Sequence, residues 1–347
     1  MSNKTLLVSF LIALAISMTK GVHAQESFCF MELNAENFFD PIDDKDKSDD
    51  DFLPGAPRAW SWKKFWKKTN NLTKVIAAAG NIAPPDVIAL CEVENDTVLT
   101  YWTKISTLRR VGYEYLITQG DDIRGMNVAF IYNPQTFKVL CHEGIRPDFS
   151  GLPDKKTRDV LYVNGMVLTG DTVDVFVCHL PSKLDRRKEG REYRMRIALE
   201  IRAKIDSIMA VRENANVIVT GDFNDTPDDK VLLHGFKAEN IYGNIDNPKK
   251  NGLYNLMFGK TANHGVKGTY CYKGEWELLD NFIVNGRLID DKSRFYTSYS
   301  QCSIFAPDFL LTEIDGRFEP LRTYKGYKYV GGFSDHLPVV VRFNYSW

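Results

Sequence analysis

Near the carboxyl end, the sequence GGFSDHLPVVVRF (residues 331–343) places three polar residues directly before a run that is typical of a buried strand. The run from Val339 to Phe343 is rich in β-branched residues, which favour strands. Ser334, Asp335 and His336 precede it, although hydrophobic burial gains nothing from them. A polar turn is one explanation and a catalytic sheet edge is the other, so the choice depends on which groups face this edge.

Polar side chains stand at the ends of apolar runs in five further places. These are Glu92 in ALCEVEN, His179 in VFVCHLPSK, Asp222 and Asn224 in VIVTGDFND, Asp280 in ELLDNFIV, and Asn34 and Glu36 in MELNAEN. Residues two apart in an extended chain point to one face, so each of the two pairs is predicted to converge. A buried polar group without a partner costs about 1–3 kcal/mol. One shared site, neutralised by a metal ion, therefore explains the pattern better than separate turns, although each residue alone also fits a turn, a cap or a rim position.

Short apolar runs alternate with amphipathic ones, which predicts a mixed α/β (α+β) domain. Strands are expected at 27–34, 86–92, 126–132, 160–168, 173–179, 216–222, 279–284 and 337–343, and helices at 61–80, 97–110 and 191–213. We expect one domain over residues 25–347.

For two other stretches, a structural role without chemistry is the favoured interpretation. The acidic stretch 40–55 could hold calcium but lacks the glycine and terminal glutamate of the helix–loop–helix motif, so a solvated loop is favoured. The basic start of the first helix, with Lys63, Lys64, Lys67 and Lys68, is expected to turn half of its lysines to solvent.

The first 24 residues have a basic start, an apolar run and a small-residue pattern, which predict a cleaved secretory signal. We therefore expect an exported protein, periplasmic or extracellular, without a transmembrane segment once the signal is removed. Loss of this segment changes the formal net charge from −1 to −3, so no general attraction to polyanions is expected. Of six cysteines, Cys29, Cys91 and Cys178 lie in apolar runs, which favours buried free thiols. The sequence leaves one disulfide among Cys141, Cys271 and Cys302 as an alternative.

Seven motifs in their order resemble the endonuclease/exonuclease/phosphatase superfamily, which includes deoxyribonucleases, abasic-site endonucleases, sphingomyelinases and inositol polyphosphate 5-phosphatases. They are LNAEN, LCEVEN, RGMNVAFIY, CHLPSK, GDFND, LLDNFIV and SDHLP, spread from Asn34 to Leu337. The GDFND motif with a later SDH is specific in combination and weak apart. The chain also looks similar to exported bacterial members. The resemblance implies a four-layer sandwich, in which two central mixed β-sheets are flanked by helices.

The resemblance also implies roles for the polar residues. Glu92 looks like the main ligand of a Mg²⁺-type ion, with Mn²⁺ or Ca²⁺ as alternatives, Asn34 stands where the family supports that metal, and Asp335 stands where it offers a further carboxylate. Glu36 is a further candidate metal ligand because of its spacing from Asn34. His336 resembles the general base, oriented by Asp280. The remaining roles are a water or phosphate contact for Asp222, a phosphoryl donor for Asn224, and polarisation of the phosphoryl group or protonation of the leaving oxygen for His179. Which group acts as the base stays open.

Substrate phosphate is expected to meet Arg124, Ser182 and Lys183, with a structural salt bridge as the alternative for Arg124. Asn281 departs from the residues that many members carry after the strand acid, which argues against the inositol phosphatase branch. We therefore predict a secreted, metal-dependent phosphodiester hydrolase of the nuclease type, acting as a monomer on a phosphate ester, with nucleic acid among the candidates. The alternatives are a phosphomonoesterase, a lipid or sugar-phosphate phosphodiesterase, and an inactive binding protein on the same scaffold.

Overall fold

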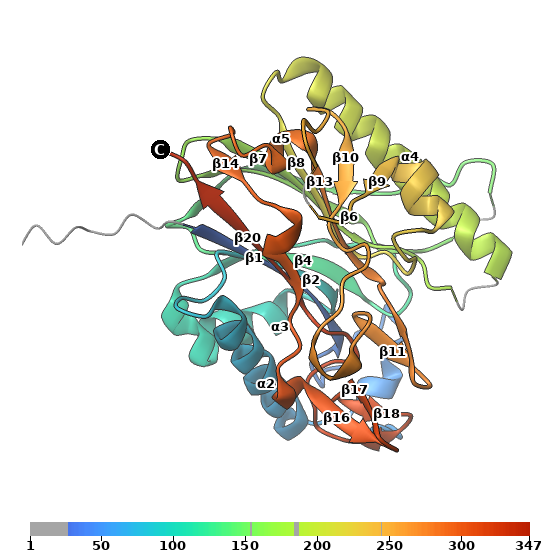
Figure 1. Cartoon of the computed structure of the whole chain (residues 1–347). Helices are drawn as coiled ribbons and strands as arrows, with labels where there is room; N and C mark the ends of the chain where they lie inside the picture. Colours follow the sequence, from blue (N-terminus) through green and yellow to red (C-terminus); the bar gives the residue numbers. More distant parts are fainter. Residues whose placement is uncertain (1–26, 153–154, 184–186, 244) are drawn as a thin grey trace, which may run out of the picture.

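Two seven-stranded mixed sheets lie face to face at the centre of the molecule (Figure 1). The computed structural model describes residues 27–152, 155–183, 187–243 and 245–347, so the predicted signal segment lies outside it. The first sheet has the order β14-β20-β1-β2-β4-β3, with β15 also paired to β20, and the second has the order β5-β6-β7-β8-β13-β10-β9.

The first sheet consists of β1 (Ser27–Phe38), β2 (Val87–Val93), β3 (Glu114–Ile117), β4 (Asn127–Tyr132), β14 (Phe295–Tyr296), β15 (Cys302–Ile304) and β20 (Val339–Tyr345). The second consists of β5 (Phe137–Ile145), β6 (Val160–Val167), β7 (Thr172–His179), β8 (Asn216–Asp222), β9 (Ala238–Asn240), β10 (Leu253–Asn255) and β13 (Asp280–Asn285). Three two-stranded ribbons follow, namely β11 (Tyr270–Tyr272) with β12 (Glu275–Glu277), β16 (Leu311–Ile314) with β17 (Arg317–Pro320), and β18 (Tyr324–Lys325) with β19 (Lys328–Tyr329).

Helices cover the outer faces of the two sheets and complete the four layers expected from the resemblance (Figure 1). Helix α2 (Trp62–Gly80) packs on the first sheet through an apolar face that includes Phe65, Leu72 and Ile76. Helix α4 (Arg187–Val211) packs on the second through Ile197 and Ile201. The other helices are α3 (Asp96–Thr100) and α5 (Gly286–Ile289), the π-helices η2 (Tyr101–Ile105) and η4 (Val231–Phe236), and the 3-10 turns η1 (Asp50–Phe52), η3 (Thr107–Val111), η5 (Asn263–Gly265), η6 (Tyr299–Gln301) and η7 (Asp308–Leu310).

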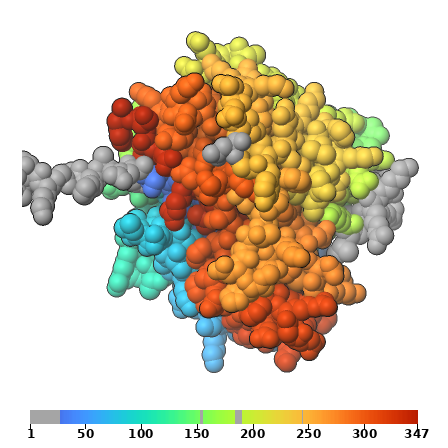
Figure 2. Space-filling view, in the orientation of Figure 1, coloured from blue at the N-terminus to red at the C-terminus, as the bar shows by residue number. Residues whose placement is uncertain are grey.

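The core lies between the sheets and beneath the helices, so the central strands are covered on both faces. This explains why β1, β2 and β8 have near-continuous apolar runs instead of alternating ones. Phe30 of β1 meets Phe282 of β13 edge to face across the interface, with ring centroids 5.1 Å apart. In Figure 2, segments from about residue 230 to the carboxyl terminus, coloured yellow to red, cover most of the face shown.

The sheet topology gathers the polar strand ends at one edge. Strands β1 and β2 run parallel in one sheet and β7 and β8 run parallel in the other, so their carboxyl ends share this edge. Strands β13 and β20 run antiparallel to β8 and β1, so they begin where those strands end. Asp280 at the start of β13 therefore pairs directly with Asp222 at the end of β8.

Glycine is required at position 221, immediately before Asp222. The backbone there has φ of 131°, and a Cβ atom would overlap the carbonyl oxygen of Cys178 on the neighbouring strand. The glycine of the GDFND motif thus lets β8 approach β7 closely at the point where both strands deliver their polar side chains.

All eight predicted strands and the predicted helices at 61–80 and 191–213 are confirmed, with boundaries shifted by a few residues. The helix predicted at 97–110 is instead divided into α3, a π-helix and a 3-10 turn. The break follows from Ser106, whose extended backbone ends the π-helix and whose hydroxyl accepts a hydrogen bond from the backbone N–H of Leu108. Within the described residues, no helix combines the length and the apolar character needed to cross a bilayer.

All six cysteines lie within the described residues and carry free thiols. Five are buried, in agreement with the prediction from their apolar surroundings, and Cys141 is exposed. The disulfide that the sequence left open is therefore not formed in this structure.

A buried ion pair joins helix α4 to the segment after β8, and its loss is predicted to destabilise the fold. The guanidinium of Arg194 donates to both carboxylate oxygens of Asp225 at 2.7 and 3.0 Å, and the two side chains are 2% and 0% exposed. Arg194→Met is expected to lower the free energy of unfolding by about 3–5 kcal/mol, because it leaves the buried carboxylate of Asp225 without its ion-pair partner. Urea denaturation measures the change. The matched control is Arg191→Met on the same helix, whose exposed pair with Asp229 should contribute less than about 1 kcal/mol; equal losses in the two variants would contradict the assignment.

Candidate active site

The sheet edge opens into a cavity of about 250 Å³ that collects most of the residues predicted from the sequence. Nine of the twelve line it, namely Glu92, Arg124, His179, Ser182, Lys183, Asp222, Asn224, Asp335 and His336. Asn34 and Asp280 lie directly behind this lining, hydrogen-bonded to Asp222 and His336 respectively. Glu36 is the residue that the structure does not bring to the cavity.

The Asp222 carboxylate is the centre of the cluster. Its Oδ2 accepts a hydrogen bond from the Asn34 side-chain amide at 3.1 Å, and it lies 3.6 Å from Nε2 of His179 and 3.9 Å from Nε2 of His336. Its Oδ1 accepts the backbone N–H of Asn224 at 2.8 Å. Burial raises the pKa of Asp222 to about 7, and Asp280 adds to this effect while His336 opposes it.

The His336 imidazole is held by Asp280. Its Nδ1 donates to Oδ2 of Asp280 at 2.7 Å, and this leaves Nε2 on the side of Asp222 and the cavity. Burial acts to lower the pKa of His336, but the carboxylates of Asp280, Asp222 and Asp335 outweigh it and hold that pKa well above its ordinary value. The ring of Tyr270 covers the imidazole, with centroids 4.8 Å apart.

The segment before β20 is fixed by Ser334, which answers why a serine stands there. Its hydroxyl donates to the carbonyl oxygen of Asn34 at 2.6 Å and accepts the backbone N–H of His336 at 3.1 Å. The backbone N–H of Leu337 in turn donates to the carbonyl of Thr269. The SDH motif is therefore a polar edge tied to β1, and it presents Asp335 and His336 at the cavity.

The second imidazole, His179, has opposite electrostatics. Burial lowers the pKa of His179 well below its ordinary value, and the nearby Arg158 and Arg124 add to this. Its Nε2 lies 3.6 Å from Asp222 and 3.9 Å from Oε1 of Glu92, while its buried Nδ1 has no hydrogen-bond partner among the described residues. The site thus pairs one imidazole that favours the charged form with one that favours the neutral form.

The oxygen ligands of the cavity fit a hard divalent cation. Asp335 is partly exposed, and burial together with repulsion from Glu92 raises its pKa. Glu92 uses one carboxylate oxygen to accept the backbone N–H of Asn37 at 2.8 Å, and its other oxygen faces His179. Two carboxylates that repel each other at the cavity surface suit Mg²⁺, which prefers oxygen ligands. Glu92 and Asp335 could hold such an ion. Asn34 lies behind them, and its amide oxygen accepts the backbone N–H of Glu36 at 2.9 Å.

A tighter acidic group, made of Asp222, Asp280 and His336, also has ligand atoms within 4.8 Å of one another. Its Asp280 is fully buried, and the contact between Asp280 and His336 is already a hydrogen bond. Mg²⁺ usually retains several waters, for which this buried group has little room. This buried group therefore suits proton transfer better than metal binding.

Glu36 does not converge with Asn34, which corrects the prediction that two-residue spacing would bring both to one point. A bulge in β1 follows Asn34, and Glu36 itself has φ of 50°, so the strand alternation is broken there. The Glu36 carboxylate instead accepts the backbone N–H of Thr323 at 2.6 Å and of Tyr324 at 3.4 Å. Burial, with repulsion from Asp335, raises its pKa to about 7.

Lys68 is buried behind Glu36, although the sequence predicted only that half of the lysines in its helix would face solvent. Its ammonium is 3.9 Å from Glu36 and donates to the Thr323 hydroxyl at 2.6 Å and to the Phe333 carbonyl at 3.2 Å. It thereby ties helix α2 to the segment that leads into Ser334. The spacing of the lysines alone contained no signal for this role.

Several further residues of the cavity were missed by sequence reasoning. Arg158 donates to Asp122 at 3.0 Å and to the Leu180 carbonyl at 3.2 Å, and it precedes β6 as Arg124 precedes β4. Its position shortly before a strand, like that of Arg124, was the available sequence signal. Tyr270, Tyr272 and Glu277 come from the short β11–β12 hairpin, where the sequence pattern is too brief to place them.

Sequence reasoning also missed Glu32, which does not line the cavity but lies fully buried below it. Neither of its carboxylate oxygens has a hydrogen-bond partner among the described residues. Burial raises its pKa well above the ordinary value, and Asp280 and Asp222 add to this. Its environment therefore favours the protonated form of Glu32. The two-residue step from Glu32 to Asn34 was the available signal.

The predicted phosphate contacts already have partners within the protein. Lys183 donates to Glu277 at 2.7 Å, Arg124 lies 3.7 Å from Asp122, and the Asn224 amide donates to the Leu180 carbonyl at 3.0 Å. Arg124 thus combines the two roles that the sequence left open, a salt bridge and a position on the cavity wall.

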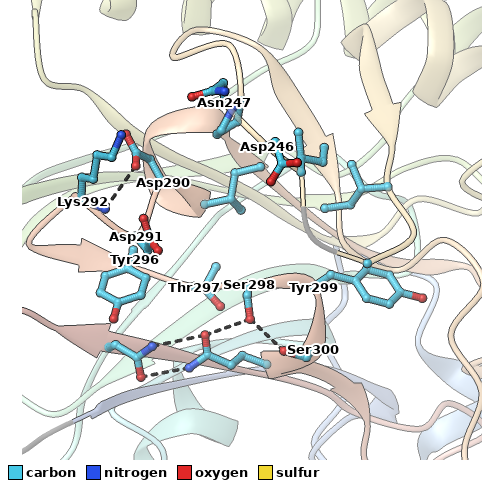
Figure 3. Close-up of a pocket in the computed structure, with 17 residues that line it drawn as sticks. Asp246, Asn247, Asp290, Asp291, Lys292, Tyr296, Thr297, Ser298, Tyr299 and Ser300 are labelled. Atoms are coloured by element: carbon cyan, nitrogen blue, oxygen red, sulfur yellow. Dashed lines mark hydrogen bonds between the residues drawn. The ribbon is translucent and has the colours of Figure 1, made fainter.

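A larger cavity of about 730 Å³ lies at the other end of the sandwich (Figure 3). Its walls include residues 245–248 and 296–301 together with Asn344 near the end of β20, whereas His336 precedes the start of that strand. Several polar side chains there are paired with one another, such as Gln301 with Asn344 and Ser298 with Ser300 (Figure 3). Among the described residues, no histidine or cysteine lines this cavity, so it lacks the imidazoles of the first cavity.

Comparison with known proteins agrees with this architecture. The model of the Endonuclease/Exonuclease/phosphatase family matches residues 29–345, and the chain therefore belongs to that family. Members of the family are divalent-metal-dependent hydrolytic phosphoesterases, and the chain is an enzyme of this class. The sequence matches none of the curated proteins.

Solved structures share the fold at low sequence identity. An endonuclease/exonuclease/phosphatase family protein from Bacteroides thetaiotaomicron has a TM-score of 0.58 at 14% identity, over 92% of this chain and 95% of that chain. A mannosyl-6-phosphatase of the same organism has a TM-score of 0.57 at 14% identity, over 91% and 99%. D. rerio TDP2 complexed with a single-strand DNA product has a TM-score of 0.53 at 16% identity, over 92% and 99%.

The pairing of His336 with Asp280 can be tested by titration. Asp280→Asn should lower the pKa of His336, because the substitution removes the carboxylate that outweighs burial, while the amide keeps the shape of the side chain. Histidine NMR in metal-free protein measures this pKa. The matched control is Asp308→Asn, which removes the carboxylate partner of the exposed His264 at 2.9 Å and should leave His336 unchanged. An unaltered His336 titration in Asp280→Asn would contradict the assignment.

Proposed function

We propose that the chain hydrolyses phosphodiesters by metal-assisted attack of water on phosphorus. The observation that carries this proposal is the convergence of His336, held by Asp280, with Asp222 and the pair Glu92 and Asp335 in one cavity. Phosphodiester hydrolysis needs an activated water, neutralised phosphoryl oxygens and help for the leaving oxygen. This cavity contains groups suited to each task.

The charges around the cavity favour an anionic phosphate ester once a metal ion is bound. The lining has three cationic side chains, Arg124, Arg158 and Lys183, and four carboxylates, Glu92, Asp222, Glu277 and Asp335. With His336 charged and His179 neutral, the forms that their shifted pKa values favour, the formal balance is 0, and a bound divalent ion would change it to +2. A phosphodiester carries one negative charge, so the metal-loaded cavity attracts it, whereas the metal-free cavity has no net charge to attract it.

The protein groups divide the proton transfers between them. When bound, a divalent ion would lower the pKa of a water and neutralise phosphoryl oxygen charge. His336 in its neutral form accepts the proton of the attacking water at Nε2, because its Nδ1 is engaged by Asp280. The positive charge of a bound ion would favour that neutral form against the nearby carboxylates. Asp222, between the two imidazoles, orients the water. His179 faces the cavity from the opposite side of Asp222, where it stabilises the phosphoryl group or the leaving oxygen, and Asn224 donates to a phosphoryl oxygen.

Phosphomonoester hydrolysis is the second candidate, and one observation favours it. Three cationic side chains around a single small cavity match the terminal oxygens of a monoester. The mannosyl-6-phosphatase among the similar structures and the TDP2 structure with single-strand DNA product illustrate the two kinds of substrate on this fold. Parallel assays with a p-nitrophenyl monoester and a bis-p-nitrophenyl diester distinguish the candidates.

We also propose that the enzyme acts outside the cytoplasm, on the basis of the signal-like residues 1–24. Determination of the amino terminus of the protein recovered from the periplasm or medium tests this. A mature chain that begins near Gln25 is the expected result, and a chain found only in the cytoplasm with an intact start would contradict it.

Replacement of the proposed base should remove most of the activity. His336→Ala is expected to lower the turnover rate by about 10²–10⁴, the range usual for a lost general acid–base group. Steady-state kinetics on the bis-p-nitrophenyl diester with Mg²⁺ measures it. His264→Ala, at an exposed histidine away from the cavity, is the matched control and should keep wild-type turnover. Near-wild-type turnover of His336→Ala would remove this residue from the mechanism.

Metal removal should abolish anion binding as well as turnover, because the cavity has no net positive charge without the ion. Calorimetric titration of inorganic phosphate into chelator-treated protein is expected to show no binding, and addition of Mg²⁺ or Mn²⁺ should restore it. Equal phosphate affinity with and without metal would contradict the charge argument. Failure of every tested phosphate ester to be cleaved with Mg²⁺, Mn²⁺ or Ca²⁺ would favour the inactive binding protein instead.

A further inference from the structure

The mouth of the active-site cavity is bridged on one side by an ion pair. Nζ of Lys183, in the segment after β7, lies 2.7 Å from Oε1 of Glu277 at the end of the β11–β12 hairpin, and both side chains line the cavity. The two side chains are 36% and 38% exposed, so the pair lies at the surface of the mouth and not in its floor. The hairpin stands beside the strand edge (Figure 1).

The position of this bridge follows from the sheet order. Strand β8 lies between β7 and β13, and Lys183 follows β7 while Glu277 shortly precedes β13. A link between these two residues therefore crosses the carboxyl end of β8, where Asp222 and Asn224 lie. A phosphate that reaches Asp222 has to enter beside this crossing, because the bridge occupies the path over the end of the strand.

The acidic loop 40–55 borders another side of the mouth. Lys47 of this loop donates from its ammonium to the carbonyls of Gly120 and Asp122, each at 3.2 Å, and the backbone N–H of Ser48 donates to the Ile123 carbonyl. The loop is thereby held against the segment that carries Arg124 of the cavity wall. Its exposed acids are Asp43, Asp44, Asp46, Asp50 and Asp51. A polyanion that continued past Arg124 would meet this negative surface.

The hairpin side of the mouth has aromatic surface. Tyr270 packs on His336, and Tyr272, two residues further along β11, is 54% exposed and lines the cavity. Tyr270 is thus committed to the imidazole. The Lys273 ammonium lies 5.2 Å from the ring centroid of Tyr272, and the exposed remainder of that ring can receive a ring of the substrate. Stacking of a base or another ring on an exposed aromatic side chain is favourable and tolerant of ring identity.

We propose that this site takes a compact phosphodiester whose one ring-bearing ester group lies on Tyr272, and that the Lys183–Glu277 bridge and the acidic loop exclude phosphates inside a continuous nucleic-acid strand. This inference rests on the proposed phosphodiesterase function and narrows its substrate class. Glu277 is then a specificity-determining residue, because its carboxylate keeps Lys183 across the mouth. The ester that fits is a small molecule or the free end of a chain.

The experiment compares two diesters at saturating Mg²⁺, the thymidine ester of thymidine monophosphate, whose leaving group is the same as in a DNA strand, and covalently closed circular DNA. Wild-type enzyme should hydrolyse the nucleoside ester at least about 100-fold faster per phosphate than it nicks the circle, because like charges at the mouth oppose the polymer. Linear single strands with free ends separate the two sources of a compact ester. Release of terminal nucleotides supports a chain end, and cleavage of the nucleoside ester alone supports a small molecule.

Two variants test the roles of the Lys183–Glu277 ion pair and of the Tyr272 ring. Glu277→Gln keeps the side-chain shape but removes the charge, and it should raise the ratio of circle nicking to nucleoside-ester hydrolysis by about 3-fold or more, the size expected for loss of one exposed ion pair. Glu275→Gln makes the same change on the same hairpin at an exposed residue outside the cavity, and it should keep the wild-type ratio. Tyr272→Ala should raise KM for the nucleoside ester by about 10-fold with little change in kcat.

The outcomes separate this inference from the function on which it rests. If wild-type enzyme nicks circular DNA as fast per phosphate as it cleaves the nucleoside ester, the substrate class is wrong although the phosphodiesterase function stands. An unchanged ratio in Glu277→Gln would remove the bridge from the explanation. If neither diester is cleaved with any divalent metal, the phosphodiesterase function fails, and this inference fails with it.

Discussion

The site depends on one carboxylate that both sheets must reach. Asp222 at the end of β8 accepts a hydrogen bond from Asn34 of β1 and lies between His179 of β7 and His336, which precedes β20. With Asp222 itself, these residues belong to four strands or their ends and to both sheets, so the sheets can pack in only one relative register if all of them are to meet. The missing side chain of Gly221 allows the close approach of β7 at this point.

The same carboxylate explains the electrostatic state of the site. Carboxylates outnumber the arginines and lysines that line the cavity, and burial raises the pKa of Asp222, of Asp335 and of Glu32 below them. A protein that concentrates acids in this way is destabilised locally unless a cation joins them. Lys68 supplies part of this compensation from behind, and a divalent ion would supply the rest. The clustered acids thus lower the free energy of unfolding of the metal-free protein, and in return they form a binding site for metal and phosphate.

The fold and the main site could be predicted because their signals are local. Apolar runs of strand length ended at acids, amides and imidazoles, and parallel order places such ends at one edge. Glu36 could not be placed, because a bulge with positive φ interrupts the two-residue alternation on which the prediction relied. Lys68 appeared to be one of several similar lysines, and only the tertiary contact with Thr323 and Phe333 distinguishes it. Tyr272 and Glu277 belong to a hairpin too short to leave a periodic pattern.

The thiols described above determine how the molecule can be handled. Cys91 is packed against the backbone N–H of Asp222, and burial raises its pKa so far that the reactive thiolate is not formed near neutral pH. The other buried cysteines are similarly shielded, whereas Cys141 lies exposed on the edge strand β5. A maleimide dye or spin label would therefore attach at this single position without mutagenesis. Such a label would report on the second sheet while the catalytic edge stays chemically untouched.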